Sequence, residues 1–272
     1  MGFFFGADID TIRPRSPELM EKLLPWVTFA ERYFRSEVRG LERIPEPGAL
    51  FVGNHSAGAL SPDSFLFGAA VYRRYGLSRL PYGLGHEVVI QLPGFRDILL
   101  PLGAVRAGHD MAEKLLTSGH NVLVYPGGDI DSCRPFRHRG KVKFGGREGY
   151  IRLALNAGVP IVPVVTSGAH STFLIIDDGQ WFAKLIGSDK WLRLKVWPLT
   201  LSLPWGLTFG WPPTHFPWRS RILIEVLPPI RFGRYGREAV ADAAYVTECA
   251  HHVESAMQAA LDRLEAERRL LS

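Results

Sequence analysis

A histidine and an aspartate stand close together in the stretch VGNHSAGALSPDSF, residues 52–65. His55 follows an apolar run among small residues, and Asp63 comes where a helix is expected to begin. A histidine general base needs one ring nitrogen facing a hydroxyl and a partner on the other nitrogen that fixes its tautomer. Asp63 could be that partner. Alternatively, Ser61 and Asp63 only cap the helix, because serine and aspartate suit helix N-termini whatever the function.

Four sequence blocks, taken in order, indicate a family. They are GNHSAGALSPDSFLF, LPLGAVRAG (100–108), VLVYPGGDIDS (122–132) and FGGREGYIRLALNAGVPIVPVV (144–165). Over about residues 40–230 they resemble the glycerolipid acyltransferases. That family includes the lysophosphatidic acid and glycerol-3-phosphate acyltransferases and a monoacylglycerol and diacylglycerol acyltransferase-like branch. The last block is the most specific, since a helix, a glycine and Val-Pro-Ile-Val-Pro rarely occur in one run by chance.

The resemblance implies an enzyme that transfers acyl groups other than amino-acyl groups. Its donor is a thioester of CoA or acyl-carrier protein, its acceptor is a glycerolipid hydroxyl, and no cofactor, metal or covalent acyl-enzyme is implied. By the same resemblance, His55 deprotonates the acceptor hydroxyl and Asp63 orients His55. The family usually has four residues between its histidine and aspartate, whereas seven separate His55 from Asp63. We interpret the extra residues as a longer loop.

The third block departs from the family at its carboxylate. Where the family often has Glu-Gly-Thr after the strand, this chain has Gly127, Gly128 and Asp129, which is closer to the neutral-lipid branch. The carboxylate that meets the acceptor is then Asp129 or Asp131, or it is absent. The two glycines could let a main-chain amide approach the acyl carbonyl oxygen and stabilise the developing charge, or they could form a tight turn.

Basic side chains supply a second group of candidates. Arg106 matches an arginine of the family's second block, and a guanidinium suits phosphate because it can donate two parallel hydrogen bonds. A basic cluster, from which we take Arg139 and Lys141 as substrate-binding candidates, could hold a phosphate or an anionic headgroup. It could equally be a solvated or membrane-facing loop. Its members are Arg134, Arg137, Arg139, Lys141, Lys143 and Arg147.

Apolar strands alternate with helices along the chain, which is typical of a mostly parallel or mixed sheet with helices on both faces. We predict a single α/β acyltransferase domain over residues 1–272, with a catalytic core at about 40–230 and added N-terminal and C-terminal helices. In such sheets the active groups lie where strands end. The expected strands are 49–54, 122–128, 159–170 and 221–230, and the expected helical regions are 16–39, 63–76, 147–158 and 236–271.

Charge and aromatic residues favour an acidic or lipid partner. A net charge of +5 is compatible with nucleic acid, an acidic membrane or a phosphorylated substrate. We expect no nucleic-acid partner, because the chain has no recognition-helix or RNA-platform signature. The proline-rich segment 191–218 holds five of the seven tryptophans. With Phe3-Phe4-Phe5 and the N-terminal helix, it predicts contact with a lipid interface, although a loop that covers the core is the alternative.

Signals for targeting are not evident in the sequence. The N-terminal apolar run is too short for a signal peptide and is followed by Asp8 and Asp10, and no stretch has the length of a spanning helix. Cys133 and Cys249 have no metal-ligand spacing and indicate a reducing compartment. We expect a peripheral protein at the cytoplasmic face of a membrane.

The predicted function is transfer of a fatty acyl group from acyl-CoA or acyl-carrier protein to a glycerolipid, such as lysophosphatidic acid or glycerol 3-phosphate, in phospholipid synthesis. One alternative acceptor is a neutral mono- or diacylglycerol or another lipid alcohol. A second alternative is hydrolysis of the acyl thioester by water. The absence of a Gly-x-Ser-x-Gly nucleophile elbow from the sequence disfavours a serine esterase. A non-enzymatic lipid-binding protein is a further class.

Overall fold

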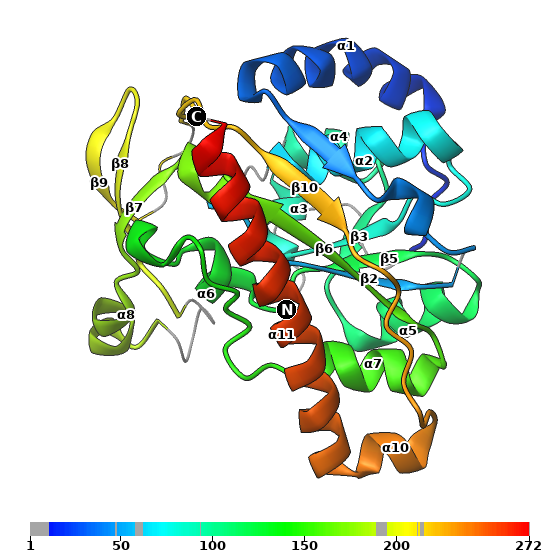
Figure 1. Ribbon diagram of the computed structural model, residues 1–272. Coiled ribbons are helices and arrows are strands. Elements are labelled where there is room, and N and C mark those ends of the chain that lie inside the picture. The colour runs from blue at the N-terminus through cyan, green and yellow to red at the C-terminus, as the bar shows by residue number, and fades with distance from the viewer. Residues whose placement is uncertain are drawn as a thin grey trace.

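The computed structural model describes residues 11–46, 48–57, 62–92, 94–188, 195–210, 212 and 215–271. A seven-stranded sheet has the strand order β1-β10-β6-β2-β5-β3-β4 (Figure 1). The predicted α/β class is confirmed. The strands are β1 (Glu37–Arg39), β2 (Leu50–Gly53), β3 (Tyr82–Gly85), β4 (Ala104–Arg106), β5 (Val122–Val124), β6 (Ile161–Ser167) and β10 (Leu223–Val226).

The central strands of this sheet run in one direction. β2 pairs in parallel with β5 on one side and with β6 on the other, so that Phe51 lies between Leu123 and Val162. β3 and β4 continue the parallel set, whereas β10 is antiparallel to β6. The sheet is therefore mixed and mostly parallel, as predicted, and five parallel strands end at the same edge.

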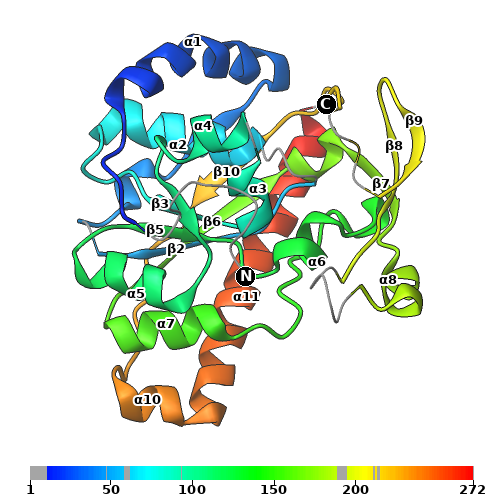
Figure 2. The ribbon, with the colours of Figure 1, turned by 180° about the vertical axis from the view of Figure 1, so that it is seen from behind.

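Helices cover both faces of the sheet (Figures 1 and 2). Leu50 and Val52 of β2 belong to an apolar cluster with α5, α7, α10 and α11, whereas Phe51 belongs to a cluster with α1 and α2. Side chains alternate along a strand, so this short apolar run is buried on both faces. The helices are α1 (Pro17–Phe34), α2 (Pro62–Tyr75), α5 (His109–Thr117), α7 (Gly149–Ala157), α10 (Arg237–Ala241) and α11 (Ala243–Leu270).

The N-terminal helix is shorter than the predicted region 16–39. The Ser16 hydroxyl accepts the Leu19 amide at 3.2 Å and caps α1. The helix continues past Pro25 and ends at Phe34 because Arg35 adopts a left-handed conformation. The next residues form β1, which pairs with β10 instead of extending the helix.

The C-terminal region 236–271 contains two helices where one was expected. Asp242 adopts an extended conformation between α10 and α11, and its carboxylate accepts the Tyr245 amide at 3.0 Å. This N-cap begins a new helix at the point where the first one ends. Shorter helices connect other elements: α3 (Glu87–Gln91), α4 (Phe95–Leu99), α6 (Gly128–Ser132) and α8 (Gln180–Ile186).

Part of the tryptophan-rich segment forms a second sheet, which we did not predict. β7 (Leu174–Asp177), β8 (Leu199–Ser202) and β9 (Gly206–Phe209) are antiparallel, and β8 and β9 form a hairpin. A high proline content disfavours a helix, but it does not predict this pairing. Trp191, Trp211 and Phe3-Phe4-Phe5 lie outside the described residues. Within the described ranges, no helix has the length and apolar character required to cross a bilayer.

Candidate active site

His55 lies just beyond the carboxyl end of β2, beside the end of β5. The ring of Tyr125, which follows β5, lies 4.7 Å from the ring of His55 between centroids. This approach depends on Gly53, because a Cβ there would be 2.5 Å from Tyr125 Cε1. The parallel pairing of β2 with β5 therefore brings together the His55 loop and the turn at 126–128.

A main-chain carbonyl fixes the ring of His55. Nδ1 of His55 lies 2.9 Å from the carbonyl oxygen of Ser56. Because a carbonyl oxygen can only accept a hydrogen bond, this contact requires the ring proton to be on Nδ1. The lone pair then lies on Nε2, so this contact alone gives His55 the tautomer that a general base needs.

Asp63 is buried at the start of α2, where its side chain meets the same serine. Oδ1 of Asp63 accepts the Ser56 hydroxyl at 2.7 Å. Burial raises the pKa of the Asp63 carboxyl, and the Ser56 hydroxyl, the charge of His55 and the amide of Ser64 oppose this rise. Ser56 thus contacts both members of the predicted pair, the histidine through its carbonyl and the aspartate through its hydroxyl. Oδ2 of Asp63 is buried and has no hydrogen-bond partner among the described residues.

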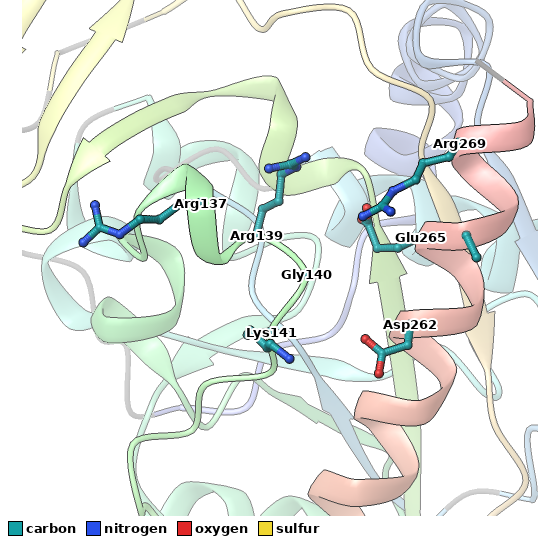
Figure 3. A pocket seen from close by; sticks show the side chains of 8 residues that line it. Arg137, Arg139, Gly140, Lys141, Asp262, Glu265 and Arg269 are labelled. Atoms are coloured by element: carbon teal, nitrogen blue, oxygen red, sulfur yellow. The ribbon is translucent and has the colours of Figure 1, made fainter.

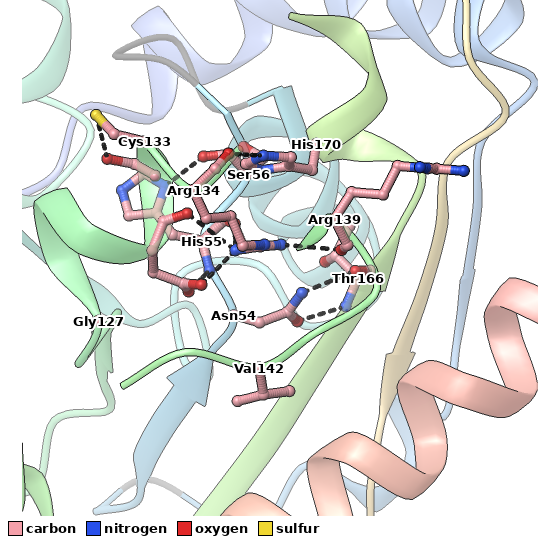
Figure 4. A network of polar contacts seen from close by, with 12 residues as sticks. Asn54, His55, Ser56, Gly127, Cys133, Arg134, Arg139, Val142, Thr166 and His170 are labelled. Atoms are coloured by element: carbon pink, nitrogen blue, oxygen red, sulfur yellow. Dashed lines mark hydrogen bonds and ion pairs between the residues drawn. The ribbon is translucent and has the colours of Figure 1, made fainter. Parts of the chain in front are cut away.

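An ion pair between Asp131 of α6 and Arg134, just after this helix, holds the main chain of His55 (Figure 4). The side chains of Asp131 and Arg134 are 0% and 1% exposed and are paired directly with each other. Oδ2 of Asp131 accepts the His55 amide at 2.6 Å, and Nη1 of Arg134 donates to the His55 carbonyl at 3.0 Å. Both polar groups of the His55 main chain are therefore fixed by one buried pair.

Further buried contacts connect this loop to β6. The Asn54 side chain exchanges two hydrogen bonds of 2.8 Å with the main chain of Thr166. Nε2 of His170 donates to the Arg134 carbonyl at 2.8 Å. Burial lowers the pKa of His170 well below its usual value, so His170 is neutral at pH 7. His170 therefore packs inside the network that supports the His55 loop.

The glycine turn after β5 is held by Arg147. The Arg147 guanidinium donates to the Gly127 carbonyl at 2.8 Å and to the Asp129 carboxylate at 2.8 Å. The amide of Gly128 donates to the Tyr125 carbonyl at 3.1 Å, and a Cβ at Gly127 would be 2.3 Å from the Lys143 carbonyl oxygen. These contacts are those of a tight, closely packed turn.

The basic cluster divides into buried and exposed members. Arg134 is almost fully buried in the ion pair with Asp131, so its assignment to a phosphate-binding or solvated cluster was wrong. Arg139 stacks over the ring of Phe136 at 4.2 Å, and its carbonyl accepts Nη2 of Arg134 at 3.2 Å. Arg139 and Lys141 line a pocket of about 360 Å³ facing α11 (Figure 3), with Arg137, Gly140, Asp262, Glu265, Ala266 and Arg269.

Arg106 lies apart from this group. It ends β4, which is separated from β2 by β5 and β3 in the sheet. At the usual strand spacing this corresponds to roughly 14 Å across the sheet. Its side chain is 45% exposed and lies 4.0 Å from the Glu87 carboxylate. Arg106 therefore shares the carboxyl edge with His55, at a distance that an extended substrate would have to bridge.

A family model described as Acyltransferase matches residues 35–167, the range that contains His55, Asp63, Asp131 and Arg134. This match assigns residues 35–167 to the acyltransferase family. The crystal structure of the 1-acyl-sn-glycerophosphate (LPA) acyltransferase PlsC from Thermotoga maritima is similar with a TM-score of 0.56 and 18% identity, covering 91% of this chain and 80% of that one. This similarity shows a common fold.

Two curated relatives extend the comparison. An uncharacterized protein of Mycobacterium tuberculosis is 30% identical over 246 residues, which cover 89% of this chain and 64% of that protein. The human DGAT1/2-independent enzyme synthesizing storage lipids is 30% identical over 171 residues, which cover 62% of this chain and 49% of the enzyme. The chain thus spans less than two thirds of the length of each relative.

An apolar pocket of about 180 Å³ lies at the start of α2. Its lining includes Pro62 and Phe65, which flank Asp63 on α2. The remaining lining residues are Phe34, His215 and Pro217. The residues come from three distant parts of the chain, so no local sequence pattern predicts the pocket. Ser56 was overlooked for a related reason, because its hydroxyl gains a role only when α2 folds back on the His55 loop.

Proposed function

We propose that this acyltransferase moves a fatty acyl group from acyl-CoA or acyl-carrier protein to a hydroxyl of a glycerolipid, with His55 as the general base. The observation that carries the proposal is the contact between Nδ1 of His55 and the Ser56 carbonyl, which leaves Nε2 able to accept a proton. The position of His55 within the matched family range supports the same role.

During the reaction His55 takes up one proton and then gives it back. Nε2 of His55 accepts the proton of the acceptor hydroxyl as its oxygen attacks the thioester carbonyl carbon. The tetrahedral intermediate then expels the thiolate as the carbon–sulfur bond breaks, and the thiolate takes the proton back from Nε2. Asp63, held through Ser56, stabilises the imidazolium that exists between these two steps.

For the acceptor, we propose a phosphorylated glycerolipid such as lysophosphatidic acid or glycerol 3-phosphate. Arg106 and the pocket at Arg139 and Lys141 offer guanidinium and ammonium groups to a phosphate. A neutral mono- or diacylglycerol is the second candidate. It is favoured by the Gly127-Gly128-Asp129 turn, whose carboxylate is already paired with Arg147, and by the storage-lipid enzyme among the relatives.

An assay of the purified protein tests both candidates. Labelled acyl-CoA and acyl-carrier protein are offered with glycerol phosphates, lysophospholipids and neutral glycerides, and both thiol release and acylated lipid are measured. Transfer to phosphorylated acceptors supports the first candidate, and transfer to neutral glycerides supports the second. Thiol release without an acylated lipid would instead identify a thioester hydrolase. His55→Gln must abolish whichever activity is found if His55 is the base.

We also propose that the protein works as a peripheral protein at the cytoplasmic face of a membrane, where glycerolipid acceptors reside. Exposed aromatic side chains support this, including Trp26 and Phe29 of α1, which are 72% and 66% exposed. Fractionation of cells tests this localisation. The protein should sediment with membranes and should be released from them by alkaline carbonate. Recovery in the supernatant without any such treatment would contradict peripheral association.

A further inference from the structure

The β8–β9 hairpin has apolar side chains on the outside and polar side chains on the inside. In its register, Leu201 lies opposite Leu207, and Thr200 lies opposite Thr208. The two leucines are 38% and 63% exposed, whereas Thr200 is buried and its hydroxyl lies 2.7 Å from that of Thr208. Neighbouring residues of a strand point to opposite faces, so the faces are reversed relative to an ordinary surface hairpin.

The apolar surface extends along the hairpin and onto α8. We call the outer hairpin face the set of Leu201, Leu203, Trp205, Leu207 and Phe209, each at least 38% exposed. Phe182 of α8 contacts Phe209 with ring centroids 4.7 Å apart. α8 adds Trp181 and Leu185, which are 63% and 74% exposed. Contiguous exposed apolar surface of this kind marks a site of protein or membrane interaction.

Direct contacts connect the outer hairpin face to α1. The amide of Phe216 donates to the Leu203 carbonyl at 2.8 Å, and the ring of Phe216 lies 6.4 Å from that of Tyr33 on α1. Phe29 stacks on Tyr33 with centroids 6.5 Å apart. In both ribbon views α1 and the hairpin reach the same end of the molecule (Figures 1 and 2). Phe216 therefore links the hairpin to the aromatic side chains of α1.

The charge around this surface favours an anionic partner. From residue 177 to residue 221 the sequence has six basic residues and three acidic residues, Asp177, Asp178 and Asp189. Among the described residues of this segment, Lys184, Lys195 and Arg219 are exposed. Basic side chains can lie along apolar surface with their charged ends at lipid phosphates. An apolar protein surface would instead have to desolvate these cations without pairing them.

We propose that the outer hairpin face, with α8 and the aromatic side chains of α1, docks the protein on one leaflet of an anionic phospholipid bilayer. This rests on the proposed function, because a glycerolipid acceptor resides in such a leaflet. The apolar pocket supports the orientation, since its residues Phe34 and Pro217 adjoin Tyr33 and Phe216 in the chain while Pro62 adjoins Asp63. The pocket thus has lining residues next to the docking surface and next to Asp63 in the chain.

Vesicle binding without any substrate tests the docking. The double variant Leu201→Thr/Leu207→Thr removes the central cross-strand pair and keeps residues that favour strands. Thr208→Ser, next to Leu207 on β9, is the matched control, because it retains the hydroxyl that bonds Thr200. Wild type should bind phosphatidylcholine vesicles that contain phosphatidylglycerol more tightly than pure phosphatidylcholine vesicles. The double variant should lose at least about tenfold in affinity, and Thr208→Ser should bind as wild type.

Quenching of tryptophan fluorescence by lipid tests the docking in the wild-type protein and does not depend on how the double variant folds. Brominated acyl chains should quench part of the wild-type tryptophan emission, and Trp205→Phe should reduce the quenched part. Unchanged vesicle affinity of the folded double variant, checked by circular dichroism, would overturn the proposal. A wild-type dimer that becomes monomeric in the double variant, with no vesicle binding, would assign the face to a second copy. If wild type binds vesicles through this face but transfers no acyl group, only the proposed function fails.

Discussion

Asp131 and Arg134 form a fully buried ion pair that accepts the amide of His55 and donates to its carbonyl. A buried pair of this kind does not by itself make a protein more stable, because removing two charges from water offsets their attraction. Its value here lies in geometry. The main chain of the candidate base is held from both sides, and the position of its ring follows from the Ser56 carbonyl.

Removal of one partner should therefore be costly. Asp131→Asn leaves the Arg134 guanidinium buried without its counter-charge, and we expect the free energy of unfolding to fall by about 3–5 kcal/mol. Urea denaturation measures this loss. The control is Asp129→Asn two residues away, whose ion pair with Arg147 is partly exposed, at 21% and 34%, and should contribute about 1 kcal/mol or less. Equal losses of unfolding free energy in the two variants would contradict a buried ion pair between Asp131 and Arg134.

Substitutions distinguish the role of the Asp63 side chain from that of the Ser56 side chain. Asp63→Asn keeps the ability to cap α2 but removes the charge that supports the imidazolium, so we expect a folded protein with kcat reduced by at least about a hundredfold. The equivalent change in the serine-protease triad, which stands on an unrelated fold, costs about ten-thousandfold. Ser56→Ala keeps the carbonyl on His55 and should reduce kcat much less. If Asp63→Asn stays within a few-fold of wild type, Asp63 is only a cap.

Much of the fold follows from short-range patterns, but the support of the site does not. Buried strands that alternate with helices predict a parallel sheet, and the carboxyl ends of its strands predict where His55 stands. The role of Arg134 was missed because a basic cluster in the sequence does not reveal which arginine meets a buried carboxylate. The hairpin was not predicted. Apolar residues alternate with other residues from Leu201 to Phe209, but this alternation does not indicate which face of the strands is exposed.

The stability of the protein should depend on His170 below neutral pH. Burial lowers the pKa of folded His170 well below its ordinary value of 6.5, so below about pH 6.5 the unfolded chain binds a proton that the folded chain does not. The free energy of unfolding then falls as the pH falls, by up to about 1.4 kcal/mol per pH unit from this group. His170→Gln can still donate to the Arg134 carbonyl and removes this titration. Denaturation of wild type and variant between about pH 7 and pH 5 should show their difference in stability narrowing; a constant difference would contradict the assignment.

Arg106 should discriminate between phosphorylated and neutral acceptors. A charge-assisted hydrogen bond contributes about 1.5–3 kcal/mol, so Arg106→Ala should raise KM for a phosphorylated acceptor on the order of ten- to a hundredfold. KM for a neutral glyceride should change little. Arg234→Ala, which removes a guanidinium paired with Asp242 at the start of α11, controls for the loss of one positive charge. Equal changes in KM for both acceptors would remove Arg106 from the acceptor site.

Gly53 offers a test of the site that alters no functional group. A Cβ at Gly53 would lie 2.5 Å from Tyr125 Cε1, so Gly53→Ala must displace either the Tyr125 ring or the strand end that carries His55. Overpacking of this kind costs about 1–3 kcal/mol, and we expect kcat to fall even where the variant is fully folded. Gly83→Ala on β3 is the matched control, because a Cβ there meets no atom within 4 Å and should leave stability and kcat close to wild type.

Thermal melts and steady-state rates of the two variants measure these effects on stability and kcat. If Gly53→Ala loses stability but keeps its kcat, the register between β2 and β5 tolerates the shift, and the contact of His55 with Tyr125 is packing without a catalytic consequence.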